Sequence, residues 1–171
     1  GRKVFDGGGV FPDVNLGASK NSEIIKAIIN SNLIFDYATN YYYKNENVDI
    51  NNFKLSNTDF SNFKNYLEAH KFSYETNTEK ALIKAQKASI LEGLNDDIEA
   101  DYNTLLSNLK QSKTAAISEN KNYILELLTE EIVKRYVYRE GLYDYYKTHN
   151  PSIKKASEIL NNSSSYTNYL K

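Results

Sequence analysis

The strongest secondary-structure signal of the chain lies in residues 118–150, which read SENKNYILELLTEEIVKRYVYREGLYDYYKTHN. At about 100° per residue the apolar side chains of this stretch fall within one broad stripe, with acidic side chains on the opposite side. The stripe consists of Ile124, Leu125, Leu128, Ile132, Tyr136, Leu142, Tyr143 and Tyr146. Pro151 restricts the backbone of Asn150 and cannot continue a helical hydrogen-bond ladder. The pattern therefore predicts one long amphipathic helix that ends at residue 150.

Two more helices are predicted in the first half of the chain. A helix over about residues 22–44 would place on one face Ile24, Ile28, Phe35 and Tyr42. A helix over about residues 57–70 would have an apolar stripe of Phe60, Phe63 and Leu67. Each stripe is wide enough to be buried against a neighbouring helix.

Capping residues mark the helices that follow. Thr76 or Thr78 can cap a third helix, and Gly93 stops it. Asp96 and Asp97 then open a fourth helix, because acidic side chains favour the first turn. After the proline, a short helix is expected over about residues 152–160. Little in this part of the chain would interrupt helices, since most of its seven glycines lie before residue 20.

The N-terminal stretch, residues 1–15, has a different character and reads GRKVFDGGGVFPDVN. Three consecutive glycines separate two apolar pairs, Val4-Phe5 and Val10-Phe11, and a Pro-Asp turn signal follows. This favours extended and loop structure. We therefore predict a mainly α fold, in which a multi-helix, bundle-like domain over residues 21–171 is preceded by a short extended Gly-rich tail over residues 1–20.

Composition excludes several classes of function. The chain has 171 residues, 40% hydrophobic and 25% charged, which is typical of a globular protein. A formal net charge of −1 gives no electrostatic basis for binding nucleic acid. No apolar run is long enough for a membrane span in this piece. Cysteine is absent, which excludes disulfides, thiolate metal sites and a cysteine nucleophile.

The N-terminal stretch also carries a family resemblance. The segment GRKVFDGGGVFPDV is similar to the one that closes the catalytic domain of carboxyl-terminal processing proteases, also called tail-specific proteases, which are serine peptidases with a Ser-Lys dyad. The matching motif residues are Gly7, Gly8, Gly9, Pro12 and Asp13, while Phe5 and Val10 stand where the family has Tyr and Ile. Residues 33–43, 72–82 and 131–136 also resemble long members of this family from Bacteroidetes.

The resemblance implies that the chain is a C-terminal fragment of such a protease. Residues 1–20 would be the end of the catalytic domain, and residues 21–171 a helical C-terminal domain without the catalytic Ser and Lys, which lie upstream in the family. The absence of Met and the unusual start at Gly1 agree with a fragment. The parent would be a periplasmic or cell-envelope endopeptidase that cleaves proteins near their C-termini. The helical domain would act as a scaffold, an oligomerisation element or a substrate gate.

The partners implied are the catalytic domain of the same parent chain, its protein substrates and a second copy of the chain in a homo-oligomer. The alternative hypothesis is a free-standing helical protein–protein interaction module with no connection to proteolysis. A signal peptide, a PDZ-like domain and a Ser-Lys core upstream in the parent reading frame would discriminate between the two. An independent enzyme has little support from the sequence.

The sequence contains no convincing catalytic, metal or cofactor site. Ser-x-x-Lys occurs four times, as Ser61/Lys64, Ser107/Lys110, Ser118/Lys121 and Ser152/Lys155. All four are predicted on polar helix faces or helix ends, where lysine stays charged, so chance explains them better than catalysis. The only histidines, His70 and His149, are each predicted at a helix C-terminus. The glycine run lacks the following helix and lysine that a phosphate loop needs.

Arg135 and Arg139 are the charged residues that fit their predicted surroundings least well. On the helical wheel both fall inside the apolar stripe of residues 118–150. Either they form an internal ion pair, for example with Asp36, or this part of the helix faces another domain or subunit. The sequence alone is compatible with both explanations.

Overall fold

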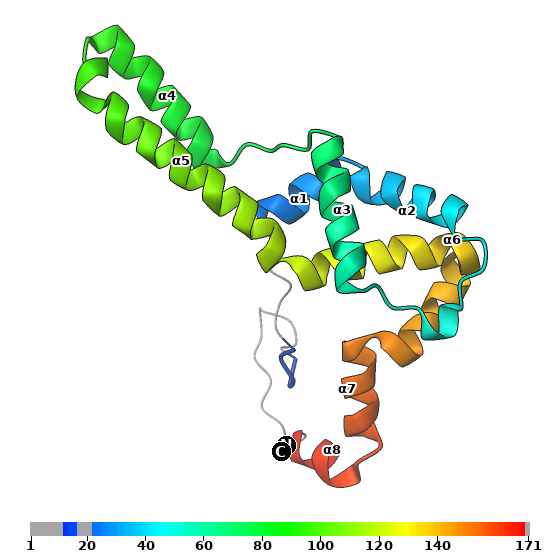
Figure 1. Ribbon diagram of the computed structural model, residues 1–171. Coiled ribbons are helices and arrows are strands. Elements are labelled where there is room, and N and C mark those ends of the chain that lie inside the picture. Colours follow the sequence, from blue (N-terminus) through cyan, green and yellow to red (C-terminus); the bar gives the residue numbers. More distant parts are fainter. Residues whose placement is uncertain (1–11, 17–21, 170–171) are drawn as a thin grey trace. The chain divides into compact units, whose positions relative to one another are not determined.

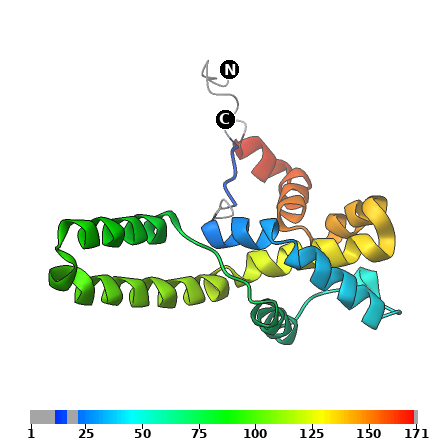
Figure 2. The ribbon, with the colours of Figure 1, turned by 90° about the horizontal axis from the view of Figure 1, so that it is seen from above.

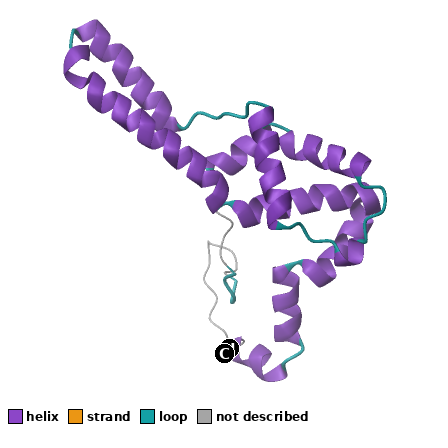
Figure 3. Ribbon diagram, in the orientation of Figure 1, coloured by secondary structure: helices purple, strands orange, loops and turns teal. Residues whose placement is uncertain are grey.

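The computed structural model of the chain describes residues 12–16 and 22–169 (Figure 1). Within them it contains eight α-helices, one short 3-10 helix and no strand (Figure 3). The prediction of a mainly α fold is therefore confirmed. The motif residues Gly7, Gly8 and Gly9 lie outside the described residues, while Pro12 and Asp13 are exposed. The extended tail and the boundary at residue 20 stay predictions.

The described chain divides into two compact units. The large unit comprises Asn21–Glu46 and Lys54–Ile132, and the small unit contains Asn47–Phe53 and Val133–Lys171. One boundary therefore falls inside α6 (Lys121–His149). No change in composition accompanies this point, and the sequence analysis did not anticipate it.

The core of the large unit is built from α1 (Glu23–Asn30), α2 (Leu33–Lys44), α3 (Asn57–Ala69) and the start of α6. Helix α2 packs against both α1 and α3. The fully buried side chains of this core are Ile24, Ile25, Ile28, Phe63, Leu67, Ile124, Leu128 and Ile132. Burial of each such side chain stabilises the fold by about 1.5–3 kcal/mol. The stripe predicted for α3 is confirmed, since Phe60, Phe63 and Leu67 are all buried.

The predicted single helix over residues 22–44 is wrong, because the chain breaks between α1 and α2. Asn32 has a left-handed backbone, with φ 61° and ψ 4°. Asparagine tolerates this conformation better than most residues do. The Ser31 hydroxyl donates to the Ile28 carbonyl at 2.7 Å and accepts from the Leu33 N–H at 3.3 Å, so it satisfies backbone groups on both sides of the break.

The break changes which side of the second segment is buried. A continuous helix would have buried Phe35 and Tyr42, but these side chains are 58% and 38% exposed. Helix α2 instead buries Leu33, Ile34 and Ala38. The physical reason is that a residue outside helical φ/ψ rotates everything that follows, so a wheel drawn across it no longer applies.

Helices α4 (Asn77–Glu92) and α5 (Asn95–Glu119) form an antiparallel hairpin and lie side by side in Figures 1 and 2. Thr76 caps α4 through a capping box with Glu79, and Gly93 ends it with φ 73°, as the sequence predicted. At the base of the hairpin Lys113 Nζ lies 2.6 Å from Glu79 Oε2. This hydrogen bond lowers the pKa of Glu79. Helix α5 also contacts α1.

The small unit contains the second part of α6, a 3-10 turn at Ile50–Asn52, α7 (Pro151–Leu160) and α8 (Ser163–Tyr169). The Tyr145 hydroxyl donates to the Phe53 carbonyl at 2.8 Å and fixes the turn segment to α6. The predicted stop before Pro151 is confirmed. Asn150 caps α7 by accepting from two backbone N–H groups, with the proline at the first helical turn.

Helix α6 is interrupted at Tyr138, which has φ 55° and ψ −165°. The single continuous helix predicted over residues 118–150 is therefore wrong. Of the predicted stripe beyond this point, Leu142 is buried, but Tyr143 is 55% exposed. The interruption brings Val137 close to Gly141. A Cβ atom added to Gly141 would lie 2.4 Å from the Val137 Cβ, so glycine is required there.

The placement of the core can be tested with two phenylalanines. We expect Phe63→Ala to lower the free energy of unfolding by about 3–5 kcal/mol, because the side chain is fully buried. Phe35→Ala is the matched control and should cost less than about 1 kcal/mol. Urea unfolding followed by circular dichroism measures both. Equal losses would mean that residues 22–44 form the continuous helix after all.

The interruption of α6 predicts the sign of another substitution. In a straight helix Gly141→Ala would stabilise the protein by about 1 kcal/mol. In this structure the added methyl group meets Val137, and overpacking of this kind costs about 1–3 kcal/mol. Thermal unfolding of Gly141→Ala should therefore show a lower Tm. A higher Tm would contradict the interruption.

Candidate functional site

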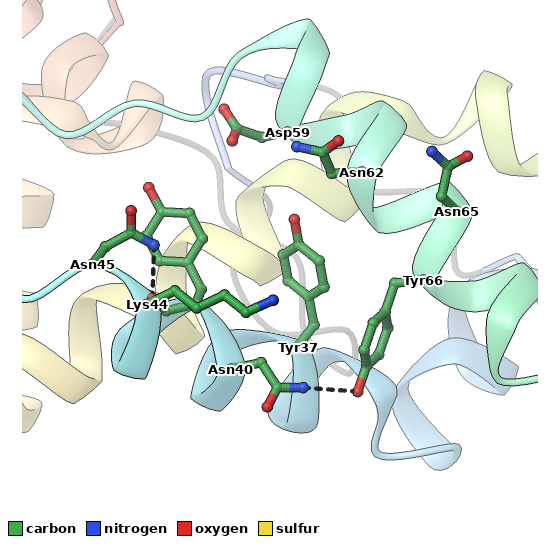
Figure 4. A pocket seen from close by; sticks show the side chains of 9 residues that line it. Tyr37, Asn40, Lys44, Asn45, Asp59, Asn62, Asn65 and Tyr66 are labelled. Atoms are coloured by element: carbon green, nitrogen blue, oxygen red, sulfur yellow. Dashed lines mark hydrogen bonds between the residues drawn. The ribbon is translucent and has the colours of Figure 1, made fainter.

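A polar groove lies between α2 and α3 in the large unit (Figure 4). Its volume is about 540 Å³. The walls consist almost entirely of tyrosine and asparagine, with one lysine and one aspartate. The lining residues are Tyr37, Asn40, Tyr41, Lys44, Asn45, Asp59, Asn62, Asn65 and Tyr66. We refer to this site as the α2–α3 groove.

Helical spacing explains why these residues face each other. Tyr37, Asn40, Tyr41 and Lys44 stand at positions i, i+3, i+4 and i+7 and so share one side of α2. The apolar side of the same helix is buried in the core. On α3, Asp59 is fixed by the capping box, in which its carboxylate accepts from the Ser56 backbone and hydroxyl groups at 2.7 and 2.6 Å.

Aromatic contacts hold the inner part of the groove rigid. The ring of Tyr37 meets the rings of Phe63 and Tyr66 edge to face, each with a centroid distance of 5.2 Å. Pairs of this geometry contribute about 0.5–1.5 kcal/mol beyond their burial. Asn40 Nδ2 donates to the Tyr66 hydroxyl at 3.3 Å and joins the two helices (Figure 4). The groove is therefore preformed.

Electrostatics keep the groove tyrosines protonated. Burial raises the pKa of Tyr37 and Tyr41 above the usual value of 10.0, and the Asp59 carboxylate raises both further. Burial also raises the pKa of Tyr66, followed by the charge of Asp36, while the hydrogen bond from Asn40 acts in the opposite direction. All three hydroxyls are therefore neutral at physiological pH.

The arrangement suits binding better than catalysis. The nine lining side chains include no serine, histidine or cysteine. Asn62 and Asn65 are exposed, and neither makes a side-chain hydrogen bond within the described residues. Such amides offer both donors and acceptors to a ligand. In the described part of the chain, no group of three or more His, Asp or Glu side chains could hold a metal ion.

The Ser-x-x-Lys pairs are dispersed over the helices. The Ser61 hydroxyl donates to the Asn57 carbonyl at 3.1 Å, and Lys155 pairs with Glu158 at 3.4 Å. Ser107 and Ser152 are exposed. Lys121 hydrogen-bonds the Asn57 side chain on α3. The side chains of these pairs therefore bond to other residues or point to solvent.

Both histidines lie at helix ends, as predicted. Nδ1 of His70 is 2.8 Å from the Tyr66 carbonyl oxygen at the end of α3. Nδ1 of His149 is 3.0 Å from the Tyr145 carbonyl oxygen at the end of α6. Each ring thus faces a helix C-terminal carbonyl, where the dipole favours a hydrogen-bond donor.

Arg135 and Arg139 lie on opposite sides of the interruption at Tyr138, so they do not share one continuous stripe. Arg135 is half-buried and Arg139 is exposed. An exposed Arg139 cannot form the buried ion pair that the wheel suggested. That either arginine faces another domain or subunit stays a prediction.

Sequence reasoning missed the α2–α3 groove. With fifteen tyrosines in the chain, tyrosine content by itself does not single out these positions. The available signal was positional: Tyr37, Asn40, Tyr41 and Lys44 repeat at helical spacing on a polar face. It could not be read while residues 22–44 were treated as one helix with a different buried side.

The fold defines the class of the chain as a helical domain, with a polar groove between α2 and α3. A protein-family profile described as "Probable PDZ-protease, C-terminal helical domain" matches residues 24–160, and the chain belongs to this family. The resemblance to the C-terminal portion of a protease is thereby confirmed, and the hypothesis of a module without a protease connection is not supported. No curated protein and no solved structure matches the chain.

The raised pKa of Tyr37 predicts how stability depends on pH. The pKa of Tyr37 in the folded state lies above its value in the unfolded state. The contribution of this side chain to the free energy of unfolding is therefore fully present below about pH 10 and is lost as the pH rises through the folded-state pKa. Tyr37→Phe removes this titration, so its stability should fall less steeply above pH 10 than that of the wild type. Urea unfolding at several alkaline pH values measures the slopes.

Tyr43→Phe is the matched control, because Tyr43 is on the same helix and 75% exposed. Its alkaline slope should remain close to that of the wild type. Equal slopes for Tyr37→Phe and Tyr43→Phe would show that the groove does not shift the titration of Tyr37.

Proposed function

We propose that this domain holds unstructured polypeptide substrates for the protease to which it belongs, and that the α2–α3 groove is the holding site. The parent protease is proposed to be an exported serine endopeptidase of the carboxyl-terminal processing type, acting in the periplasm or cell envelope. Its serine nucleophile and lysine base would lie upstream of this chain. The domain itself contributes binding and scaffolding, not chemistry.

The observation that carries the proposal is the composition of the groove. An unstructured polypeptide has an unpaired N–H and C=O at almost every residue. Exposed asparagine amides such as Asn62 and Asn65 can pair with both groups. Tyrosine rings add a flat contact surface at low entropic cost, as they do in antibody binding sites.

The balanced charge of the groove is compatible with polypeptide ligands of different sequences. Lys44 and Asp59 are the charged residues among its lining side chains, and they have opposite signs. A groove of this kind has no strong preference for acidic or basic segments. This property suits a protease that must accept the tails of different proteins.

The scaffolding part of the proposal concerns the small unit. Arg139 is exposed on the second part of α6 and is a candidate contact for the catalytic domain of the parent. A charge-assisted hydrogen bond to a carboxylate would suit the planar guanidinium.

Binding of a disordered polypeptide tests the proposal directly. We expect the 171-residue chain to bind a fluorescently labelled, casein-type polypeptide, measured by anisotropy. The double variant Asn62→Ala/Asn65→Ala should weaken binding about tenfold, because each lost hydrogen bond is worth about 0.5–1.5 kcal/mol. The chain alone should not cleave the probe.

Asn108→Ala/Asn122→Ala is the matched control. These asparagines are also exposed on helices of the large unit but do not line the groove. This variant should bind like the wild type. The proposal fails if the wild type does not bind, or if both double variants lose affinity equally.

A further inference from the structure

The α4–α5 hairpin buries very little of itself. Its only buried side chains are Ser89 on α4 and Tyr102 on α5. Leu91, near the tip, is 88% exposed. Further apolar side chains that remain exposed around the tip are Ile90, Leu94, Ile98 and Leu105. A soluble two-helix hairpin with so small a core has apolar surface left for another partner.

Charge on the hairpin is strongly segregated. The stem carries exposed lysines, and the tip carries exposed acidic residues. The stem lysines are Lys80, Lys84, Lys87 and Lys110, and the tip acids are Glu92, Asp96, Asp97, Glu99 and Asp101. None of these side chains forms an ion pair with another described residue.

This segregation is unfavourable within a single hairpin. Lys80, Lys84 and Lys87 follow at spacings of four and three residues, so their like charges are neighbours on one side of α4. The acids of the tip crowd each other in the same way. Opposite charges placed against both regions would remove this repulsion.

We propose that the α4–α5 hairpin pairs with the same hairpin of a second copy of this chain, in antiparallel orientation. The acidic tip of one copy then lies against the lysine stem of the other, and the reverse contact forms at the same time. An antiparallel, two-fold symmetric arrangement is the one in which one surface is complementary to itself. The product is a four-helix bundle, in which Leu91 becomes buried.

Helix geometry places like groups on one side of each helix. The lysines at 80, 84 and 87 and Leu91 share one side of α4, while Asp96, Glu99 and Lys110 share one side of α5. Along its length the hairpin therefore has a basic stem end, an acidic tip end and an apolar side chain, Leu91, near the tip.

The dimensions are sufficient for a weak to moderate dimer. The 16 residues of α4 span about 24 Å, at about 1.5 Å per residue. A standard protein–protein interface buries roughly 800 Å² on each partner. Two paired helices of this length reach a comparable area only if most of the hairpin takes part. The complementary ends of the hairpin achieve full overlap in the antiparallel arrangement. This inference does not depend on the proposed function of the α2–α3 groove.

Charge reversal tests the pairing. Sedimentation equilibrium of the 171-residue chain at micromolar concentrations should show a monomer–dimer equilibrium. Lys80→Glu/Lys84→Glu makes both ends of the hairpin acidic, and Asp96→Lys/Glu99→Lys makes both ends basic. Each double variant alone should dissociate at least about tenfold more readily than the wild type. An equimolar mixture of the two should restore dimers, because every contact then joins opposite charges.

Lys54→Glu/Lys154→Glu changes the net charge as the first variant does, but at exposed sites outside the hairpin, and should dimerise like the wild type. Circular dichroism confirms that each variant is folded. A wild type that stays monomeric over the whole concentration range overturns the proposal. So does a dimer that neither double variant weakens, or a mixture of the two that remains monomeric.

Discussion

The large unit depends on one constraint. Four short helical segments must bury their apolar sides in one common core. Helices α1, α2, α3 and the start of α6 each contribute one apolar side and leave the other free. The left-handed Asn32 lets α1 and α2 bury their apolar sides independently, since it removes the fixed rotation that a continuous helix would impose. The polar side of α2 then faces the polar side of α3, and the α2–α3 groove results from the same packing that forms the core.

The α2–α3 groove is formed by helices that also form the core, and no further helix is needed to build it. Phe63 is fully buried and also touches the ring of Tyr37, so one side chain supports both the core and the inner wall of the groove. Asp59 has a similar double role, because it completes the capping box of α3 and, after burial, contributes to the raised pKa of Tyr37 and Tyr41. A change that loosened α3 would therefore disturb the groove even where it altered none of the lining residues.

The α4–α5 hairpin follows a different principle. Its ends are fixed by local features, namely the capping box of Thr76 and the left-handed Gly93, with the Glu79–Lys113 pair at its base. These features determine a hairpin without needing a large core. The outer faces of the two helices therefore carry charged and exposed apolar side chains that the hairpin itself does not need. Such surfaces are typical of elements that contact another protein.

The sequence by itself determined the mainly α class, the family and most helix ends. Caps, glycine and proline act over a few residues, so the cap at Thr76 or Thr78, the stop at Gly93 and the helix end before Pro151 could be predicted without knowledge of the fold. The stripe of α3 was also predictable, because that helix is uninterrupted. Only the tertiary structure decided the breaks at Asn32 and Tyr138, since both residue types are also common inside helices and the residue type alone does not select the positive φ. With those breaks unknown, the buried side of α2, the α2–α3 groove and the exposure of Arg139 could not be derived, because each depends on the rotation of a helix about its axis.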